Sequence, residues 1–120
     1  MKAVCISCFN YYDNRIKYIE NFLVNKGYEV IYITSDFDHV GKTTRIAKTE
    51  ENKIYIKTLP YYKNLSLRRL FSHYLFSINI VKEIKRHKPD LIYVMIPPNS
   101  LLKHLAQYKR EYNIKLICDI

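Results

Sequence analysis

The chain has very little glycine, and neither glycine stands where a dinucleotide site would need one. Its 120 residues include only Gly27 and Gly41. A dinucleotide-binding fold carries Gly-x-Gly-x-x-Gly directly after its first strand. Gly41-Lys42-Thr43-Thr44 is similar to the end of a phosphate loop, but the earlier glycine of that motif is replaced by Asp36. The sequence therefore argues against nicotinamide or flavin dinucleotides, and a solvated loop is the favoured interpretation of residues 41–44.

Long apolar runs are also missing. No stretch approaches the ~18 uninterrupted apolar residues of a membrane span. The N-terminus enters a strand pattern at once and lacks the small-residue cleavage site of a secretory signal. Cys5 and Cys8 form a C-x-x-C spacing on a predicted strand, where residues three apart point to opposite faces. Together with Cys118 they are expected to be buried thiols in a reducing compartment. We therefore expect a cytoplasmic protein, at most peripheral on the inner face of the cell membrane.

The sequence also shows no cluster of metal-binding residues and no pair of acidic residues at the end of the first strand. The four histidines show no metal-ligand spacing with each other or with cysteine, so we assign no metal. A phosphate-accepting receiver domain would need paired acids at the end of the first strand, and Ser7-Cys8-Phe9-Asn10 contains none. The sequence assigns no catalytic residue.

The composition is that of a globular protein with a strong positive charge. Apolar residues make up 48% of the chain, charged residues 26%, and the net charge is +9. A length of 120 residues fits one domain, spanning residues 1–120. Two explanations of the charge stay open. One is an anionic partner, such as a bilayer, a nucleic acid or a phosphorylated substrate. The other is a general richness in Lys, Ile, Asn and Tyr, as AT-rich coding would produce.

The hydrophobic pattern is organised around residues 91–96. This run is apolar throughout, and it lies between Pro89-Asp90 and Pro97-Pro98. A strand that is apolar on both faces is typical of the middle of a parallel sheet. Further strands are expected at residues 2–8, 29–35, 53–58 and 115–120. Helices are expected at about 15–26, 66–87 and 100–112, with Asp13 or Asn14 capping the first and Ser66 the second. Residues 36–52 are expected to form a long loop or a ragged hairpin.

Alternation of strands and helices predicts an α/β fold: a Rossmann-like open parallel sheet in three layers, α/β/α. Residues 53–58 alternate between apolar and polar, which predicts an edge strand with one solvated face. The predicted strand order is 3-2-1-4-5. The order reverses between strands one and four, so a ligand crevice is expected between Phe9–Asn14 and Pro97–Ser100.

The whole chain resembles the N-terminal half of a GT-B glycosyltransferase of the retaining family 4 type. The resemblance is carried by residues 23–34 (LVNKGYEVIYIT), by Pro89–Val94 with Pro97-Pro98, and by Ile117-Cys118-Asp119-Ile120. The loop after the first strand often carries glycines in that family and here reads Phe9-Asn10-Tyr11-Tyr12-Asp13. The resemblance implies an acceptor-binding domain that is inactive alone. It also implies a nucleotide-sugar donor, bound in the full enzyme by a C-terminal domain with two glutamates seven residues apart; this chain lacks that domain.

With that family as a guide, the side chains expected to bind the acceptor are Asn10, Tyr11, Tyr12, Asp13, Asn99 and Ser100. The acceptor would be a surface polysaccharide or a lipid-linked sugar. Arg68 and Arg69 are expected to contact an anionic membrane or a phosphate group. The last strand is apolar at what would be an open sheet edge, which suggests a fragment or a partner that supplies the next strand.

Two other functions stay open. The first is a free-standing flavodoxin-like binding module without catalysis. The second is a basic nucleic-acid binder, whose affinity would fall steeply with salt. No stretch resembles a nucleic-acid module, so we expect no nucleic-acid partner.

Overall fold

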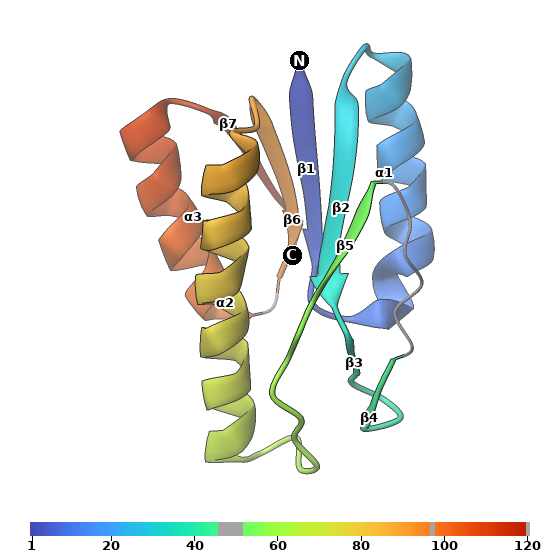
Figure 1. Ribbon diagram of the computed structural model, residues 1–120, viewed down its shortest axis with the longest axis vertical. Coiled ribbons are helices and arrows are strands. Elements are labelled where there is room, and N and C mark those ends of the chain that lie inside the picture. The colour runs from blue at the N-terminus through green and yellow to red at the C-terminus, as the bar shows by residue number, and fades with distance from the viewer. Residues whose placement is uncertain (46–51, 97, 120) are drawn as a thin grey trace.

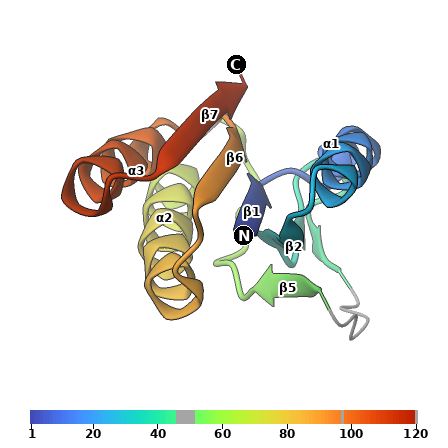
Figure 2. The same cartoon turned by 90° about the horizontal axis from the view of Figure 1, so that it is seen from above.

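The fold is an open, fully parallel sheet with helices on both faces. The computed structural model describes residues 1–45, 52–96 and 98–119. Within these residues, one five-stranded sheet has the order β5-β2-β1-β6-β7 (Figures 1 and 2). The strands are β1 (Lys2–Ser7), β2 (Glu29–Ser35), β5 (Lys53–Ile56), β6 (Leu91–Met95) and β7 (Lys115–Asp119). All four neighbouring pairs are parallel.

The strand numbers differ from the predicted 3-2-1-4-5 because the described part of the chain contains two further short strands. β3 (Phe37–Asp38) and β4 (Thr43–Thr44) form an antiparallel hairpin outside the main sheet. Counted by residue range, the neighbours in the main sheet are those that the sequence predicted. Of the two alternatives for residues 36–52, the described part therefore forms the hairpin, and residues 46–51 lie outside the described residues.

Within residues 1–45, 52–96 and 98–119, three α-helices cover the sheet, one on one face and two on the other. They are α1 (Asp13–Asn25), α2 (Leu67–His87) and α3 (Asn99–Tyr112). Figure 2 shows α1 on one side of the sheet, and α2 and α3 together on the other. A short 3-10 turn, η1 (Asn10–Tyr12), precedes α1. The predicted three-layer, Rossmann-like architecture is thus present.

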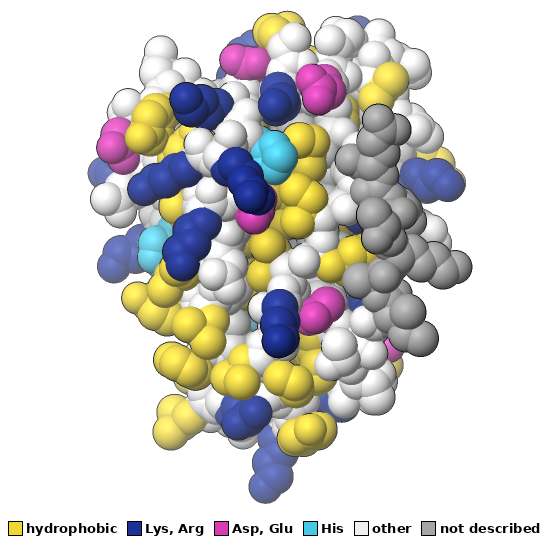
Figure 3. Space-filling view, viewed as in Figure 1, with side chains coloured by type: hydrophobic (Ala, Val, Ile, Leu, Met, Phe, Trp, Pro, Cys, Tyr) yellow, Lys and Arg dark blue, Asp and Glu magenta, His cyan; other side chains and the backbone are white. Residues whose placement is uncertain are grey.

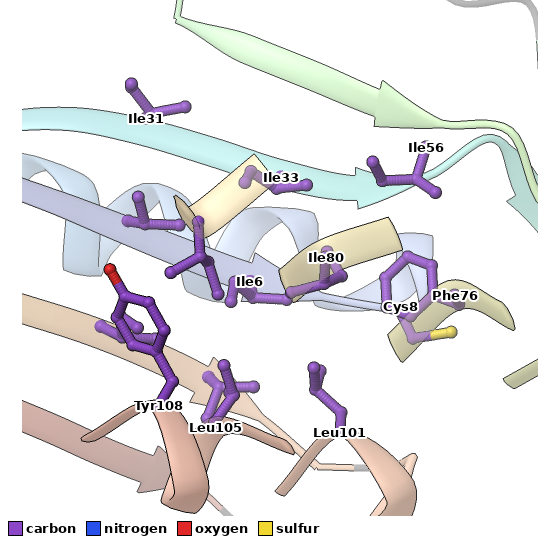
Figure 4. Close-up of a cluster of buried hydrophobic side chains, with 14 of the residues drawn as sticks. Ile6, Cys8, Ile31, Ile33, Ile56, Phe76, Ile80, Leu101, Leu105 and Tyr108 are labelled. Atoms are coloured by element: carbon purple, nitrogen blue, oxygen red, sulfur yellow. The ribbon is translucent and has the colours of Figure 1, made fainter. Parts of the chain in front are cut away.

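The apolar residues of the strands divide into two cores. One core lies between the sheet and α2 and α3, where Ile6 and Ile33 meet Ile80 and Leu105 (Figure 4). The other core lies beneath α1, where Ile16 packs among residues of the opposite sheet face. Successive strand residues point to opposite faces, so a sheet covered on both sides needs the unbroken apolar runs that the sequence shows. Cys5 belongs to the α1 core and Cys8 to the other, as their spacing predicted.

Helix α1 begins differently from the prediction. We expected Asp13 or Asn14 as its cap, but the N-cap is Tyr12, which makes no side-chain cap, and Asp13 is already helical. The Asp13 carboxylate instead forms ion pairs with side chains from other segments, as described below. At the other end, Gly27 follows the helix with a φ of +90°, the left-handed conformation that favours glycine.

The strand and helix ends otherwise follow the sequence to within one or two residues. Ser66 caps α2 by accepting a hydrogen bond from the Arg69 amide, 3.1 Å away. α3 begins at Asn99, one residue before the predicted start, and Pro98 is its N-cap. Among the described residues, no helix is long and apolar enough to cross a bilayer.

Candidate functional site

The carboxyl ends of the sheet strands and the N-terminal ends of α2 and α3 lie at the same end of the molecule, the lower end in Figure 1. Strand order reverses between β1, which pairs with β2, and β6, which leads into α3. In open α/β sheets, ligands bind beyond the carboxyl ends of the strands at such a reversal. The search for a site therefore begins with the segments that follow β1 and β6.

A cavity of about 760 Å³ opens between the first turns of α2 and α3. Its polar lining includes Arg69, His73, Asn99 and Ser100. Leu65, Leu67, Leu70 and Tyr74 line its apolar part. Two of the predicted acceptor-binding residues, Asn99 and Ser100, and one predicted phosphate contact, Arg69, are thus brought together. Leu67, Leu70 and His73 of α2, which share the cavity with them, were not predicted.

An aromatic cluster fills the space beside the cavity. The Phe9 ring lies 5.4 Å from that of Tyr11 and 4.3 Å from that of His39, in stacked arrangements. The Tyr61 ring meets the His73 ring edge-on at 5.7 Å, and the Tyr61 hydroxyl is hydrogen-bonded to His39 Nδ1. Residues from four separate segments therefore form one continuous aromatic cluster, in which Phe9, Tyr61 and His73 are buried and Tyr11 is half exposed.

The predicted residues of the loop after β1 belong to this aromatic cluster. Tyr11 and Tyr12 have ring centroids 4.4 Å apart, and the Tyr11 side chain is half exposed. Asn10 Oδ1 is buried and has no hydrogen-bond partner within residues 1–45, 52–96 and 98–119. None of the three is part of the cavity wall as far as the structure describes it. They adjoin the cavity through Phe9, whose ring lies 5.8 Å from that of His73.

His73 joins the cavity and the cluster. Its side chain is 7% exposed, and no described residue accepts from or donates to its Nε2. Burial, and then the positive charge of Arg69 and the proximity of His39, lower the pKa of His73 to about 4. The imidazole is therefore neutral near pH 7, and one ring nitrogen can bond to a ligand. A histidine on an apolar helix is more often a satisfied core residue; this ring is buried, but its Nε2 is not satisfied by any described residue.

Asp13 lies apart from the cavity, in an ionic cluster. Its carboxylate accepts a hydrogen bond from the Tyr32 hydroxyl at 2.6 Å and pairs with Arg45 at 2.8 Å and Lys53 at 3.6 Å. The Lys53 ammonium also stands over the Tyr55 ring, 5.0 Å from its centroid. The predicted edge strand is present, and Lys57, just after β5, is exposed as predicted. The prediction of a solvated face is wrong at Lys53, whose side chain is packed and only 15% exposed.

The two arginines that start α2 are used differently. Arg68 Nε donates to the Pro60 carbonyl at 2.5 Å, and its side chain does not belong to the described cavity wall. Arg69 Nη1 donates to the Asn64 carbonyl at 2.8 Å, and Arg69 lines the cavity. The sequence treated the pair as equivalent, whereas helical geometry turns adjacent residues about 100° apart.

Cys8 is inert in this setting. It is fully enclosed, and burial raises the pKa of its thiol to about 12, against a smaller opposite effect from Arg69. The thiolate, which is the nucleophile and the metal ligand, is therefore not populated at neutral pH. The described residues contain no group of three or more metal-ligating side chains.

No family model matches this sequence, and a search of curated proteins finds no match either.

Proposed function

We propose that the chain is the N-terminal, acceptor-binding domain of a GT-B glycosyltransferase, one that transfers a sugar from a nucleotide-sugar to a surface polysaccharide or lipid-linked acceptor. The observation that carries this proposal is the cavity beside the strand-order reversal of a Rossmann-like sheet. The family resemblance adds the expectation that a second domain supplies the donor. The isolated chain is then a binding domain and not a catalyst.

The side chains at this end of the sheet suit a saccharide. Asn99 is exposed in the cavity wall, and its amide can both donate to and accept from sugar hydroxyls. Tyr11 presents a half-exposed ring on which the apolar face of a sugar ring can stack. Amides close to flat aromatic surfaces bind sugars well, because a sugar ring has polar edges and apolar faces.

The beginning of α2 suits a membrane surface. Six large apolar side chains are exposed there, with Leu65 at 96% and Leu67 at 84%. The others are Tyr62, Leu70, Phe71 and Tyr74. Figure 3 shows hydrophobic side chains gathered at the lower end of this face, with basic side chains among them. Apolar side chains beside Lys63 and Arg68 are typical of proteins that lie on anionic bilayers. We include an anionic membrane surface among the proposed partners.

The test of the proposed function is binding by the isolated chain combined with an assay for transfer. Short oligosaccharides titrated into 15N-labelled protein should shift the amide signals of residues 10–12 and of Asn99. Nucleotide-sugars should neither be hydrolysed nor used as donors by this chain alone. Transfer by the isolated chain would contradict the division of labour between two domains. Failure of every saccharide to shift these signals would favour a binding module for another ligand.

The membrane part has a separate test. Sedimentation with phosphatidylglycerol vesicles should fall several-fold for Leu67→Glu, because the substitution places a charge in the inserted surface. Lys85→Glu serves as the matched control, since this exposed basic residue lies near the far end of α2. Equal loss in both variants would indicate general charge attraction and no defined insertion surface.

A further inference from the structure

The N-terminus of α3 has unfilled hydrogen-bonding capacity. The first N–H groups of any helix lack intrahelical acceptors. At α2 the Ser66 side chain accepts one of them. At α3 the N-cap is Pro98, whose side chain has no acceptor, and no side-chain cap is formed. In this 14-residue helix the Leu101 amide donates to the Pro98 carbonyl at 3.1 Å, which leaves the amides of Asn99 and Ser100 without an acceptor among the described residues. Both residues line the cavity, so these two N–H groups and the positive end of the helix dipole lie at its wall.

A second observation at the same cavity points independently to a ligand. His73, on α2, lines the cavity and is only 7% exposed. Its Nε2 has no hydrogen-bond partner among the described residues. An unpaired buried polar atom costs about 1–3 kcal/mol. A ligand atom that hydrogen-bonds to Nε2 would remove this cost.

Charge selects the kind of ligand. Arg69 lines the cavity between these two features, and the described wall contains no aspartate or glutamate. Arg69 is held in place by its bond to the Asn64 carbonyl and by a side-chain hydrogen bond with Tyr61. A guanidinium has five N–H donors, so these two bonds do not use all of them. A helix N-terminus and a guanidinium converging on one space are the usual donors to a phosphate group.

The donors are held rigidly with respect to one another. Ser77 Oγ, fully buried on α2, donates to the His73 carbonyl at 2.9 Å and is also 2.9 Å from Ser100 Oγ. Because the single Ser77 proton goes to that carbonyl, Ser100 is the donor between the two hydroxyls. His104 Nδ1 lies 2.8 Å from the Ser100 carbonyl. The first turn of α3 is thereby fixed against α2, so the site exists before its ligand arrives.

We propose that this cavity binds the phosphate of an ester with an apolar substituent, the phosphate lying on the α3 N-terminus between Arg69 and His73. Leu67, Leu70 and Tyr74 form the adjoining apolar wall, where an alkyl or prenyl chain would lie. The site stands on its own geometry; only its assignment to the phosphate of a lipid-linked acceptor rests on the proposed function. That phosphate would anchor the acceptor, while the aromatic cluster would face its sugar.

The first experiment titrates 15N-labelled protein with inorganic phosphate and with hexyl phosphate, using hexanol as the neutral control. Hexyl phosphate should shift the Asn99 and Ser100 amides and the His73 ring signals, and should bind more tightly than inorganic phosphate. Equal affinity for both would remove the apolar part of the proposal. No shift at α3 with either ligand would overturn the site.

Two adjacent arginines give a matched pair of variants. Arg69→Gln should weaken hexyl phosphate binding roughly tenfold, as expected for the loss of a charge-assisted hydrogen bond. Arg68→Gln removes the same charge one residue away and should change the affinity less than about twofold, because Arg68 bonds to Pro60 outside the cavity wall. His73→Asn tests the second donor, with thermal unfolding confirming that each variant is folded. Equal losses at Arg68 and Arg69 would show diffuse attraction and contradict a defined site.

Vesicles separate a membrane headgroup from a free ester. Phosphatidylglycerol vesicles that bind the chain without shifting Asn99 and Ser100 would indicate that the exposed end of α2 alone touches the membrane, and would count against a headgroup as occupant. The outcome for the proposed function is read separately. Hexyl phosphate binding without saccharide binding would leave the phosphate site standing and remove the acceptor domain.

Discussion

Two polar regions lie at the same end of the sheet, and they differ in how fully their polar groups are paired. Around Asp13, one carboxylate is bonded by a phenol, a guanidinium and an ammonium from three other segments. Around the α2–α3 cavity, His73 Nε2 has no partner among the described residues and α3 has no side-chain cap. The first arrangement stabilises the fold and leaves nothing for a ligand. The second costs stability in the free protein, and a ligand would offset that cost.

The comparison predicts first that His73 makes the fold sensitive to acid. The unfolded imidazole takes up a proton near pH 6.5, whereas the native one, with its pKa lowered to about 4, does so only near pH 4. Between these values the unfolded state binds more protons, so stability falls as pH falls. The loss is roughly 3 kcal/mol by pH 4. Urea unfolding of wild type and His73→Phe from pH 7 to pH 4 should show curves that diverge by this amount.

In that experiment, the difference between the two proteins cancels the acid sensitivity of all other groups, including Asp38, whose pKa is lowered by hydrogen bonds from the Gly41 and Val40 amides. Parallel curves for wild type and variant would mean that His73 is accessible to protons in the native state. His73 could then no longer be described as an unpaired buried group at the cavity.

The second prediction concerns the satisfied region. Asp13→Ala should lower the free energy of unfolding by about 2 kcal/mol, because it leaves the half-buried Arg45 and Lys53 without their carboxylate. Glu29→Gln, which removes an exposed carboxylate from β2, should cost less than about 0.5 kcal/mol. Neither change should alter hexyl phosphate affinity in a titration of the folded variants. A loss of affinity in Asp13→Ala alone would merge the two regions into one site.

The third prediction compares the two helix starts. Ser66→Ala removes the side-chain acceptor that caps α2 and should cost about 1 kcal/mol in urea unfolding. Pro98→Asp places a carboxylate at the start of α3, where it would bond to the free N–H groups. It should weaken hexyl phosphate binding roughly tenfold by occupying the same donors. Unchanged binding in Pro98→Asp would remove the α3 N-terminus from the phosphate site.

The fold was predictable because its signals are local. The unbroken apolar run at Leu91–Met95 identifies a strand covered on both faces, and Ser66 identifies the start of α2. The prediction was weaker for the hairpin of β3 and β4, because strands of two residues are too short to show a periodic pattern. The packing of Lys53 was missed, because nothing local to it indicates that Asp13, forty residues earlier, would pack against it.

The candidate site was predictable only in part, for a related reason. Strand order and the position of prolines placed Asn99 and Ser100 at a crevice shared with residues 9–14. In the structure these two residues line a cavity whose other described wall comes from residues 64–74 instead. Asp13 was grouped with them because it follows β1, yet its partners Tyr32, Arg45 and Lys53 come from tertiary structure. His73 sits on an apolar helix and gives no sequence signal of an unpaired nitrogen. That α3 is uncapped could have been suspected from Pro98, since proline offers no side-chain acceptor.

The most direct test of this account is amide chemical-shift mapping of the folded chain with hexyl phosphate. The account predicts that the largest shifts fall on Asn99 and Ser100, with Asp13 and Arg45 unmoved. Shifts centred on Asp13 and Arg45, or shifts spread evenly over basic residues of the surface, would contradict it.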